Sequence, residues 1–423
     1  YLLLQSIQIS DHDFQAPVPE DSPFTLHNIP FGVISTDSDP KRRCATALGH
    51  YAVDLSLLWK DKKDDGLELT QSLYDIFSQI NPSLQPSLNS FAALSSKTRS
   101  KVREILIHDL SVGSVPEESF IPLSEVHMHL PMKIWGYSDF FCSLEHARNC
   151  APLTGGEVSR NFFYAPSVYN GRASSVVPSP HPIRRPKGVK YDSDADQPVY
   201  GPSAKMDYEL EMGYFVSTPI PLGETINADN ASEHIFGFVL LNDWSSRDIQ
   251  AFEMAPLGPF HSKGFGTSIS PWIVTLDALK PFACQPAHDH STTEFDHQRY
   301  AKRTTATFDI KLSASLISKQ YNSGNLRSLY WTPYQQIAHH ASAGCGLETG
   351  DMMGTGTISG QDEGELGCLF EATMNGSRPL EYPNGTKVKY LDDGDEIVLE
   401  AWCDNGTRRI GFGECRGSIL PSS

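Results

Sequence analysis

The sequence predicts a protein that is mostly β with some α, built as a small N-terminal domain followed by a larger one. Three observations lead to this fold class. The chain has 423 residues, which is more than one typical hydrophobic core holds. Short alternating apolar stretches, separated by Gly, Pro and Asn-Gly pairs, dominate after residue 131. The clearest helical periodicities lie before that point. We therefore expect one domain over residues 1–130 and a second over residues 131–423.

The N-terminal domain is expected to combine short strands with a helical tail. Residues 32–35 and 44–58 have strand-like patterns around turns. Apolar side chains then recur at helical spacing in two later stretches, which predicts two amphipathic helices. These positions are Leu73, Ile76, Phe77 and Ile80 in the first helix and Val102, Ile105 and Leu106 in the second. Residues 111–131 contain three prolines and little periodicity, so we place the domain boundary there.

Strand signals dominate the larger domain, for example over residues 208–216, 307–316 and 397–402. Strands at irregular spacing with few long helices favour a mixed, strand-rich core over a doubly wound sheet. Residues 183–202 contain an Arg-Arg-Pro segment and an Asp-rich run, and we expect them to form a surface loop.

Composition narrows the partners and the compartment. The formal net charge of -17 makes nucleic acid and anionic membranes poor partners. No run of about 18 apolar residues exists, so no transmembrane helix is expected. The eight cysteines form no C-x-x-C pair, which favours reduced, mostly buried thiols in the cytoplasm. Four N-x-S/T sequons leave glycosylation open, although three of them read Asn-Gly and favour hairpin turns instead: Asn230, Asn375, Asn384 and Asn405.

Two acidic residues alternate in the stretch from Tyr208 to Met212. Side chains alternate across a strand, so Glu209 and Glu211 are expected to point to one face. Two carboxylates on one face repel each other unless a cation lies between them. The alternative is an ordinary amphipathic strand with a solvated face, and taken alone this stretch favours that alternative.

Two further stretches carry candidate site residues at helical spacing. Asp243, Arg247 and Gln250 would share one stripe of a helix, although a surface ion pair near a helix start explains them equally well. Asp139 and His146 are seven residues apart, which is two helical turns, so both could face one site. A single His or Asp is more often a structural residue than a catalytic one.

Two glycine-rich stretches, residues 263–267 and 354–360, match neither a dinucleotide-binding fingerprint nor a phosphate-binding loop. We therefore exclude nucleotide binding and expect these glycines to let the backbone approach a ligand closely. Four carboxylates are available for a hard cation, and ligation by oxygen alone favours Mg²⁺ or Ca²⁺ over zinc. They are Asp139, Glu209, Glu211 and Asp243.

Read in order, the motifs around these residues resemble the fumarylacetoacetase family. The resemblance runs from Phe24 to the C-terminus. It rests on Tyr137-Ser138-Asp139-Phe140, Asn170-Gly171-Arg172-Ala173-Ser174-Ser175, Pro182-Ile183-Arg184-Arg185-Pro186, Glu209-Leu210-Glu211-Met212, Asn242-Asp243-Trp244, Pro256-Leu257-Gly258-Pro259-Phe260, Gly356-Thr357-Ile358-Ser359-Gly360 and Leu391-Asp392-Asp393-Gly394-Asp395.

The resemblance implies an SH3-like β-barrel for the N-terminal domain, a mixed β-roll for the C-terminal catalytic domain, and a homodimer. It implies a hydrolase that depends on Mg²⁺ and/or Ca²⁺ and cleaves a C–C bond in a small 1,3-diketone acid. Such a substrate is 4-fumarylacetoacetate, which gives fumarate and acetoacetate at the end of tyrosine and phenylalanine breakdown.

The resemblance also implies roles for single residues. His146 would be the general base, oriented by Glu371, and an imidazole pKa of about 6.5 suits that role near neutral pH. The metal would be held by Asp139, Glu209, Glu211 and Asp243, with Lys263 and Thr267 beside it. The developing oxyanion would face Arg247, Gln250 and Lys263. The substrate would contact Tyr169, Phe141, Arg247, Gln250 and Thr357.

Two departures from the family pattern bear on the substrate. The family has a Tyr at the position of Phe141, and its hydroxyl contacts the substrate. The family also has an Arg in the loop after the catalytic His, where it grips the substrate's carboxylate. Here that loop is shortened and carries no Arg around Leu153-Thr154-Gly155-Gly156, while Arg148 and Arg160 are out of register. Losing an oriented, charge-assisted contact weakens the preference for fumarylacetoacetate.

These departures leave two alternatives to the hydrolase. One is a paralogue that uses the same metal–enolate site on a different diketone in secondary metabolism, by C–C hydrolysis, decarboxylation, tautomerisation or C–C bond formation. The other is a non-catalytic binding protein. The presence of both His146 and Glu371 favours hydrolysis, because decarboxylation needs no activated water.

Overall fold

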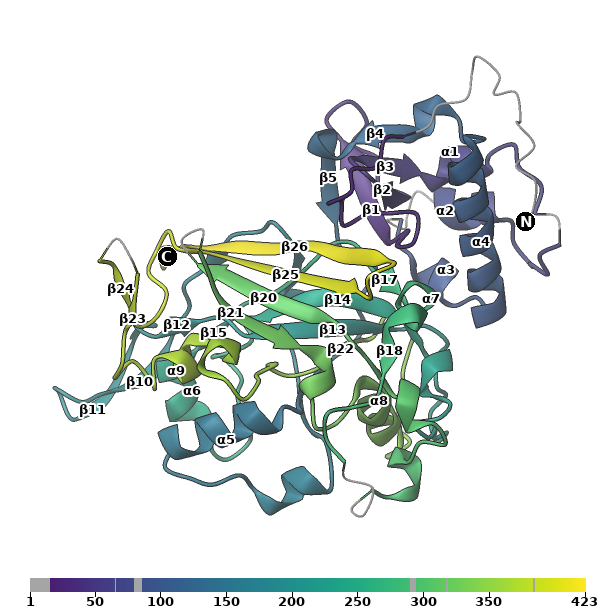
Figure 1. Cartoon of the computed structure of the whole chain (residues 1–423). Coiled ribbons are helices and arrows are strands. Elements are labelled where there is room, and N and C mark those ends of the chain that lie inside the picture. Colours follow the sequence, from purple (N-terminus) through teal and green to yellow (C-terminus); the bar gives the residue numbers. More distant parts are fainter. Residues whose placement is uncertain (1–15, 65, 80–85, 290–293, 317–318, 383–384) are drawn as a thin grey trace.

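The structure, a computed structural model, describes residues 16–64, 66–79, 86–289, 294–316, 319–382 and 385–423. A small unit formed by the first part of the chain lies at one end of a larger, strand-rich body (Figure 1). The expected fold class, mostly β with some α in two parts, is confirmed. Among the described residues, no helix combines the length and the apolar character that a membrane span requires.

The N-terminal unit is built on a five-stranded antiparallel sheet with the order β4-β3-β2-β1-β5. Every residue of its interior strand β1 is buried, which shows that both faces of the sheet are covered there. The strands are β1 Phe31–Thr36, β2 Arg43–Leu48, β3 Tyr51–Asp54, β4 Phe120–Pro122 and β5 Val126–His129.

Four helices pack beside this sheet: α1 Leu55–Trp59, α2 Leu73–Ser78, α3 Asn89–Ala92 and α4 Ser96–Val112. Both predicted helices are confirmed as α2 and α4, and Ile80 lies outside the described residues. The strand predicted over residues 44–58 is wrong at its end. Asp54 caps α1 by accepting hydrogen bonds from the backbone N–H groups of Ser56 and Leu57, so the chain turns into a helix there.

Residues 111–131 are more ordered than the lack of periodicity indicated. They carry the two edge strands β4 and β5, which pair with β3 and β1. The strands are only three and four residues long. Such short pieces leave almost no alternating pattern in the sequence, which explains why the prediction missed them.

The larger body is centred on a mixed sheet with the strand order β7-β6-β22-β13-β14-β16-β8, and β17 also pairs with β14. The long strands β13 and β14 are antiparallel and buried along their whole length. The strands are β6 Tyr137–Phe141, β7 Ser167–Asn170, β8 Val176–Pro178, β13 Leu210–Val216, β14 Ile235–Asp243, β16 Thr267–Ile269, β17 Val274–Thr275 and β22 Met352–Gly354.

A second sheet, with the order β21-β20-β25-β26-β9, lies over β13 and β14 (Figure 1). Residues from both sheets form one buried cluster, for example Met212 and Leu240 with Leu312 and Leu399. The strand predicted over residues 307–316 is interrupted, since its first two residues pair elsewhere as β19. The strands are β9 Ile183–Arg184, β20 Lys311–Leu316, β21 Lys319–Asn325, β25 Glu396–Asp404 and β26 Arg409–Leu420.

The expected surface loop over residues 183–202 is instead strand β9 followed by an exposed hairpin of β10 and β11. Three other pairs of short strands join β12 to β15, β18 to β19 and β23 to β24. Their bounds are β10 Lys187–Asp192, β11 Gln197–Pro202, β12 Met206–Asp207, β15 Ser245–Ser246, β18 Ala283–Cys284, β19 Thr307–Phe308, β23 Leu380–Glu381 and β24 Lys387–Val388.

Five helices complete the larger body: α5 Leu144–Leu153, α6 Arg247–Glu253, α7 Leu276–Leu279, α8 Pro333–Ala341 and α9 Leu369–Ala372. Helices α5, α6 and α9 lie together on the side of the body away from the N-terminal unit (Figure 1). The N-terminal unit packs on the central sheet through aromatic rings, because Phe31 and Phe91 both contact Phe236 of β14.

Candidate active site

A cavity of about 720 Å³ opens where the ends of β6, β13 and β14 meet helices α5 and α6. Eleven of the residues singled out from the sequence line it: Asp139, Phe141, His146, Tyr169, Glu209, Glu211, Asp243, Arg247, Gln250, Lys263 and Thr357. A larger cavity of about 850 Å³ lies elsewhere, next to α4 and α7, and its described lining includes none of them. The chemistry therefore belongs to the smaller cavity.

Three carboxylates meet at its base. Asp139 comes from β6, Glu211 from β13 and Asp243 from the end of β14, and each is 1 % exposed. One carboxylate oxygen from each lies within 4.8 Å of the other two. Three strands of one sheet, with β22 between β6 and β13, thus bring together acids that are far apart in the sequence.

The three carboxylates of this cluster repel one another when they are ionised. Burial and then the charges of Asp139 and Asp243 raise the pKa of Glu211 well above its ordinary value. Burial also raises the pKa of Asp243, where the attraction of Lys263 is outweighed. The pKa of Asp139 is raised by burial as well. Negative charge in this cluster is therefore undercompensated by the protein itself.

Glu209 has a different environment although it points to the same cavity as Glu211. It lies just before β13 and pairs with Lys263 and, at 2.8 Å, with Nη1 of Arg247. Burial acts to raise its pKa, but these two cations outweigh burial and lower it. The prediction that Glu209 and Glu211 share a face is confirmed. The solvated-face alternative is wrong, because the two residues are 5 % and 1 % exposed.

The donor set fits a hard divalent cation. Oδ1 of Asp139 and Oδ1 of Asp243 are buried and have no hydrogen-bond partner among the described residues. Unpaired buried carboxylate oxygens are costly, and oxygen ligands at one point are what Mg²⁺ and Ca²⁺ prefer. Among the described residues, the cations that pair with these four carboxylates and with Asp207 are Lys263 and Arg247. A dication would compensate that excess of negative charge.

The glycine-rich stretch 354–360 shapes the base of the cluster. A side chain at Gly354 would meet Oδ1 of Asp139 at 2.5 Å. Gly356, at φ +81°, donates its N–H to Oε2 of Glu211 at 3.0 Å. These glycines therefore allow the backbone to approach the carboxylates, which agrees with the expectation of a close backbone approach.

A second group, beside the first, is a buried His–Glu pair. His146 lies in the first turn of α5, where the hydroxyl of Ser143 caps the helix. Its Nδ1 lies 2.7 Å from Oε2 of Glu371 in α9. Glu371 also accepts hydrogen bonds from Asn149 and Ser359, each at 2.9 Å, so its position is determined by several contacts. Because Nδ1 is bonded to Glu371, Nε2 is the nitrogen left to exchange a proton.

The charges of this pair stabilise each other. Burial acts to lower the pKa of His146, but the carboxylate of Glu371 outweighs burial and raises the pKa to about 10. Conversely, burial acts to raise the pKa of Glu371, and His146 lowers it. The expectation of an ordinary imidazole pKa is therefore wrong. Glu371, which the resemblance assigned to orient His146, lies in buried contact with the ring, and this contact raises the pKa.

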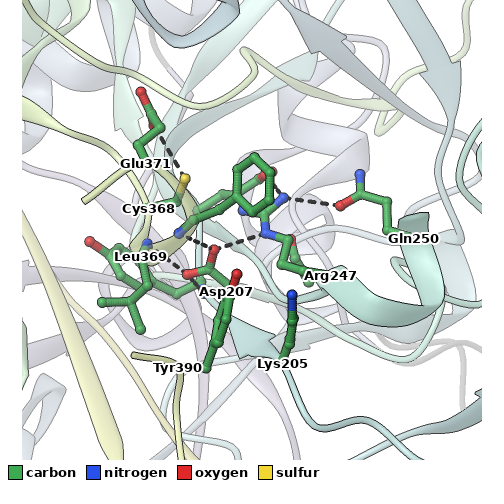
Figure 2. Close-up of polar contacts among 12 residues, drawn as sticks. Lys205, Asp207, Arg247, Gln250, Cys368, Leu369, Glu371 and Tyr390 are labelled. Carbon is green, nitrogen blue, oxygen red and sulfur yellow. Dashed lines mark hydrogen bonds and ion pairs between the residues drawn. The ribbon is translucent and has the colours of Figure 1, made fainter. Parts of the chain in front are cut away.

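The third group is Arg247 with its acidic support. Nε of Arg247 donates to Asp207 at 2.8 Å and Nη1 donates to Gln250 at 3.1 Å, as Figure 2 shows. Nη2 is buried without a hydrogen-bond partner among the described residues, and Arg247 lines the cavity. Asp243 ends a strand and only Arg247 and Gln250 are helical, so the single helical stripe predicted for the three is wrong. The strand end nevertheless places all three at the cavity.

Asp139 and His146 likewise do not share a helix, since one lies in β6 and the other in α5.

Tyr169 donates to Asp139 at 3.1 Å or to Asp243 at 2.9 Å. Phe141 is 37 % exposed at the cavity, and its ring centroid lies 5.3 Å from that of His146. Thr267 is buried opposite Asp243 in the sheet, outside the described lining of the cavity.

The shortened loop after α5 contributes no cation to the cavity. Leu153 and Thr154 line it, whereas Arg148 is paired with Glu145 and Arg160 lies over the ring of Tyr164.

Sequence reasoning missed several residues that hold the site together: Tyr137, which donates to Asp139; Asn149 and Ser359, which donate to Glu371; Cys368, which lies 3.2 Å from Glu371; and Asp207. Asp207 continues the alternation of Glu209 and Glu211 in the sequence. That alternation is the signal from which it could have been found.

Comparison with known proteins gives matches over nearly the whole chain. The model of the fumarylacetoacetate (FAA) hydrolase C-terminal domain matches residues 136–420, and that of the fumarylacetoacetase N-terminal domain matches residues 27–131. Fumarylacetoacetase of Arabidopsis thaliana is 42 % identical, with 96 % of this chain and 97 % of that protein covered. Fumarylacetoacetase of Homo sapiens is 40 % identical, with coverages of 96 % and 98 %.

Solved structures show the same fold at low sequence identity. A fumarylacetoacetate hydrolase from Exiguobacterium antarcticum matches with a TM-score of 0.52 and 16 % identity, covering 93 % of this chain and 99 % of its own. A maleylpyruvate hydrolase from Sphingobium matches with a TM-score of 0.51 and 15 % identity, covering 92 % and 100 %.

Proposed function

We propose, from the premise that this chain belongs to the fumarylacetoacetase family, that it hydrolyses a C–C bond in 4-fumarylacetoacetate to give fumarate and acetoacetate. The observation that carries the proposal is the presence, in one cavity, of a buried His146–Glu371 pair and a three-carboxylate cluster. The first can activate water and the second can hold a Lewis acid, and hydrolysis of a 1,3-diketone needs both.

We propose Mg²⁺ or Ca²⁺ as the cofactor, held by Asp139, Glu211 and Asp243 with Glu209 as the fourth carboxylate and with Lys263 and Thr267 adjacent. The unpaired oxygens of Asp139 and Asp243 and the raised carboxyl pKa values support this set. A dication held by these residues would supply Lewis acidity toward the diketone.

His146 acts on the water. Glu371 holds Nδ1 and stabilises the imidazolium, so Nε2 of the neutral ring accepts the proton from water. The hydroxide oxygen adds to the carbonyl of the acyl half. When the C–C bond breaks, its electron pair passes to the departing carbon, and that carbon then takes up a proton. The products are two acids, and one water is consumed.

We propose that the oxyanion formed at that carbonyl is stabilised by Arg247, Gln250 and Lys263. The support is the free, buried Nη2 donor of Arg247 at the cavity wall. A preorganised donor of this kind stabilises developing charge by about 2.7–4 kcal/mol in enzymes where one has been removed. Tyr169 and Thr357 are placed at the wall to position the substrate, and Phe141 supplies an apolar contact beside His146.

The rest of the molecule is proposed to follow the family. Strand β5 ends at His129 and β6 begins at Tyr137, which supports domains at residues 1–130 and 131–423.

We infer a homodimer, supported by a short stretch with exposed apolar side chains that offers an interface: Phe252, Met254, Leu257 and Phe260. Its test is the solution mass by light scattering. Eight free cysteines support the cytoplasm as the compartment.

The test follows the loss of diketone absorbance when the protein with Mg²⁺ or Ca²⁺ meets fumarylacetoacetate. His146→Ala removes the base, so we expect turnover to fall by about 10²–10⁴-fold. His181→Ala, at an exposed position, is the control and is expected to match the wild type. A His146→Ala protein that keeps more than about a tenth of the activity would show that His146 is not the general base.

A different outcome concerns the substrate. If metal binds but the wild-type protein leaves fumarylacetoacetate intact, the proposal fails and the same centre must serve another diketone. The comparisons favour fumarylacetoacetate, since the curated relatives at about 40 % identity are fumarylacetoacetases.

A further inference from the structure

One lysine at the cavity has no place in the chemistry described so far. Lys205 precedes β12 and lines the cavity together with Arg247. Its carbonyl accepts the backbone N–H of Arg247 at 2.9 Å, and β12 pairs with β15 immediately before α6. Lys205 is therefore held in register with Arg247, and Figure 2 shows its side chain beside Tyr390 and near Arg247.

The charge of Lys205 sets it apart from the other cations of the cavity. Arg247 is paired with Asp207 and Glu209, and Lys263 with Glu209 and Asp243. Lys205, Arg247 and Lys263 are the Lys and Arg residues in the described lining of the cavity.

Nζ of Lys205 donates to the neutral amide oxygen of Asn375 at 2.8 Å and lies 5.6 Å from the ring centre of Tyr390. Within the part of the chain that the structure describes, no carboxylate lies within 4 Å of Nζ, and the side chain is half-buried. A half-buried cation in an acidic protein, facing a ligand cavity without a counter-ion, is a ready partner for an anionic group of the ligand.

Asp248, an acid of the cavity wall that accepts the N–H of the residue before Lys205, does not fill that role. Asp248 is engaged elsewhere, since its oxygens accept from Ser203 and from the N–H of Ala204, both at 2.7 Å, and Lys190 lies at 3.3 Å. The charge of Lys205 is thus left for a ligand.

We propose that Lys205 binds the terminal carboxylate of the acyl half of the substrate and so selects a dicarboxylate. This inference rests on the proposed function, in which Arg247 marks the carbonyl of the acyl half. Lys205 lines the same cavity as Arg247 and is bonded to it through the backbone, so a group that continues from that carbonyl past Arg247 would meet the Lys205 ammonium. In fumarylacetoacetate this group is the fumaryl chain, which ends in a carboxylate. Phe141 and the loop after α5 add no cation to the described lining of the cavity.

The test compares two substrates and three variants. The substrates are fumarylacetoacetate and its analogue with the fumaryl carboxylate converted to a carboxamide. Lys205→Met keeps the aliphatic stem and removes the charge, Lys205→Arg keeps the charge, and Lys187→Met on the exposed hairpin is the control. For the dicarboxylate, we expect Lys205→Met to lower kcat/KM by about 10- to 150-fold, mainly through KM.

For the carboxamide, the same variant is expected to stay within about threefold of the wild type, because the charged partner is already absent. Lys205→Arg restores most of the activity on the dicarboxylate. Equal losses on both substrates would indicate a structural role through Asn375 and Tyr390 and would overturn the proposal, as would no loss on either.

A binding measurement separates this inference from the proposed function. Calorimetry of fumarate and of fumaramate with the metal-loaded wild-type and Lys205→Met proteins needs no turnover. Tighter binding of fumarate, lost in Lys205→Met, supports the carboxylate site even if neither diketone is hydrolysed. Equal affinities of the wild type and Lys205→Met for fumarate contradict it even if fumarylacetoacetate is hydrolysed rapidly.

Discussion

The carboxylate of Asp207 is fully buried and lies 2.8 Å from Nε of Arg247. It also accepts the backbone N–H groups of Leu369 and Phe370, both at 2.8 Å, in the first turn of α9. Helix α9 carries Glu371, which in turn holds His146. One buried carboxylate therefore ties the position of the oxyanion donor to the element that orients the base (Figure 2).

Asp207→Asn tests this link. The substitution leaves Arg247 with Glu209 as its remaining carboxylate partner, and removing one partner of a buried ion pair costs about 3–5 kcal/mol. We expect a lower midpoint of thermal unfolding and a fall in kcat that exceeds the change in KM. Asp393→Asn is the matched control, since Asp393 pairs with Arg185 at the surface, where such a pair contributes about 0–1 kcal/mol. Similar effects of the two variants would contradict the role of Asp207.

The pH dependence of Glu371→Gln follows from its effect on His146. Glu371 raises the pKa of His146 to about 10, and the base must be neutral to accept a proton. The rate of the wild-type protein is therefore expected to rise with pH toward that value. Without the carboxylate the pKa falls, so the rising limb of the pH profile moves to lower pH, by about 1–3 units.

The plateau rate of Glu371→Gln should also fall, since the amide does not stabilise the imidazolium. The measurement is kcat/KM against pH for the wild type, for Glu371→Gln and for a control, Glu145→Gln. Glu145 lies in α5, the helix that carries His146. If the limb of Glu371→Gln coincides with that of the wild type, another group controls it.

Metal binding is expected to stabilise the fold. A ligand at 100 times its Kd adds about 2.7 kcal/mol to the free energy of unfolding. Adding Mg²⁺ or Ca²⁺ to chelator-treated protein should therefore raise the unfolding temperature, and Asp243→Asn should shift this effect to higher metal concentrations. The exposed Asp296→Asn serves as the control. An identical metal titration for Asp243→Asn and the wild type would place the ion elsewhere.

Phe141→Tyr tests the apolar contact beside His146. The ring is 37 % exposed at the cavity, so an added hydroxyl has room to reach a bound ligand. A hydrogen bond of about 0.5–1.5 kcal/mol corresponds to a KM for fumarylacetoacetate about 2- to 12-fold lower, with kcat nearly unchanged. Steady-state kinetics measure this, with Phe252→Tyr at an exposed position as the control. An unchanged KM would mean that the substrate does not approach this ring.

Local pattern was enough for much of the fold. The strand-rich composition, the helix through Leu73 and Phe77 and the strand containing Glu211 all follow from short-range periodicity, and the structure agrees with each. Local pattern failed where elements are very short or where a cap redirects the chain. Strands β4 and β5 are too short to alternate visibly, and Asp54 starts a helix inside a stretch that reads as strand.

The sequence by itself determined which side chains were available: the alternating Glu209 and Glu211, a His, and an Arg with a nearby Gln. Only the tertiary structure decided that Asp139, Glu211 and Asp243 meet, since they come from three strands of one sheet, and β22, from much later in the chain, lies between β6 and β13. The same holds for His146 and Glu371, which are 225 residues apart. The physical reason is that pKa values and metal affinity depend on distances and burial, and those depend on contacts between distant segments.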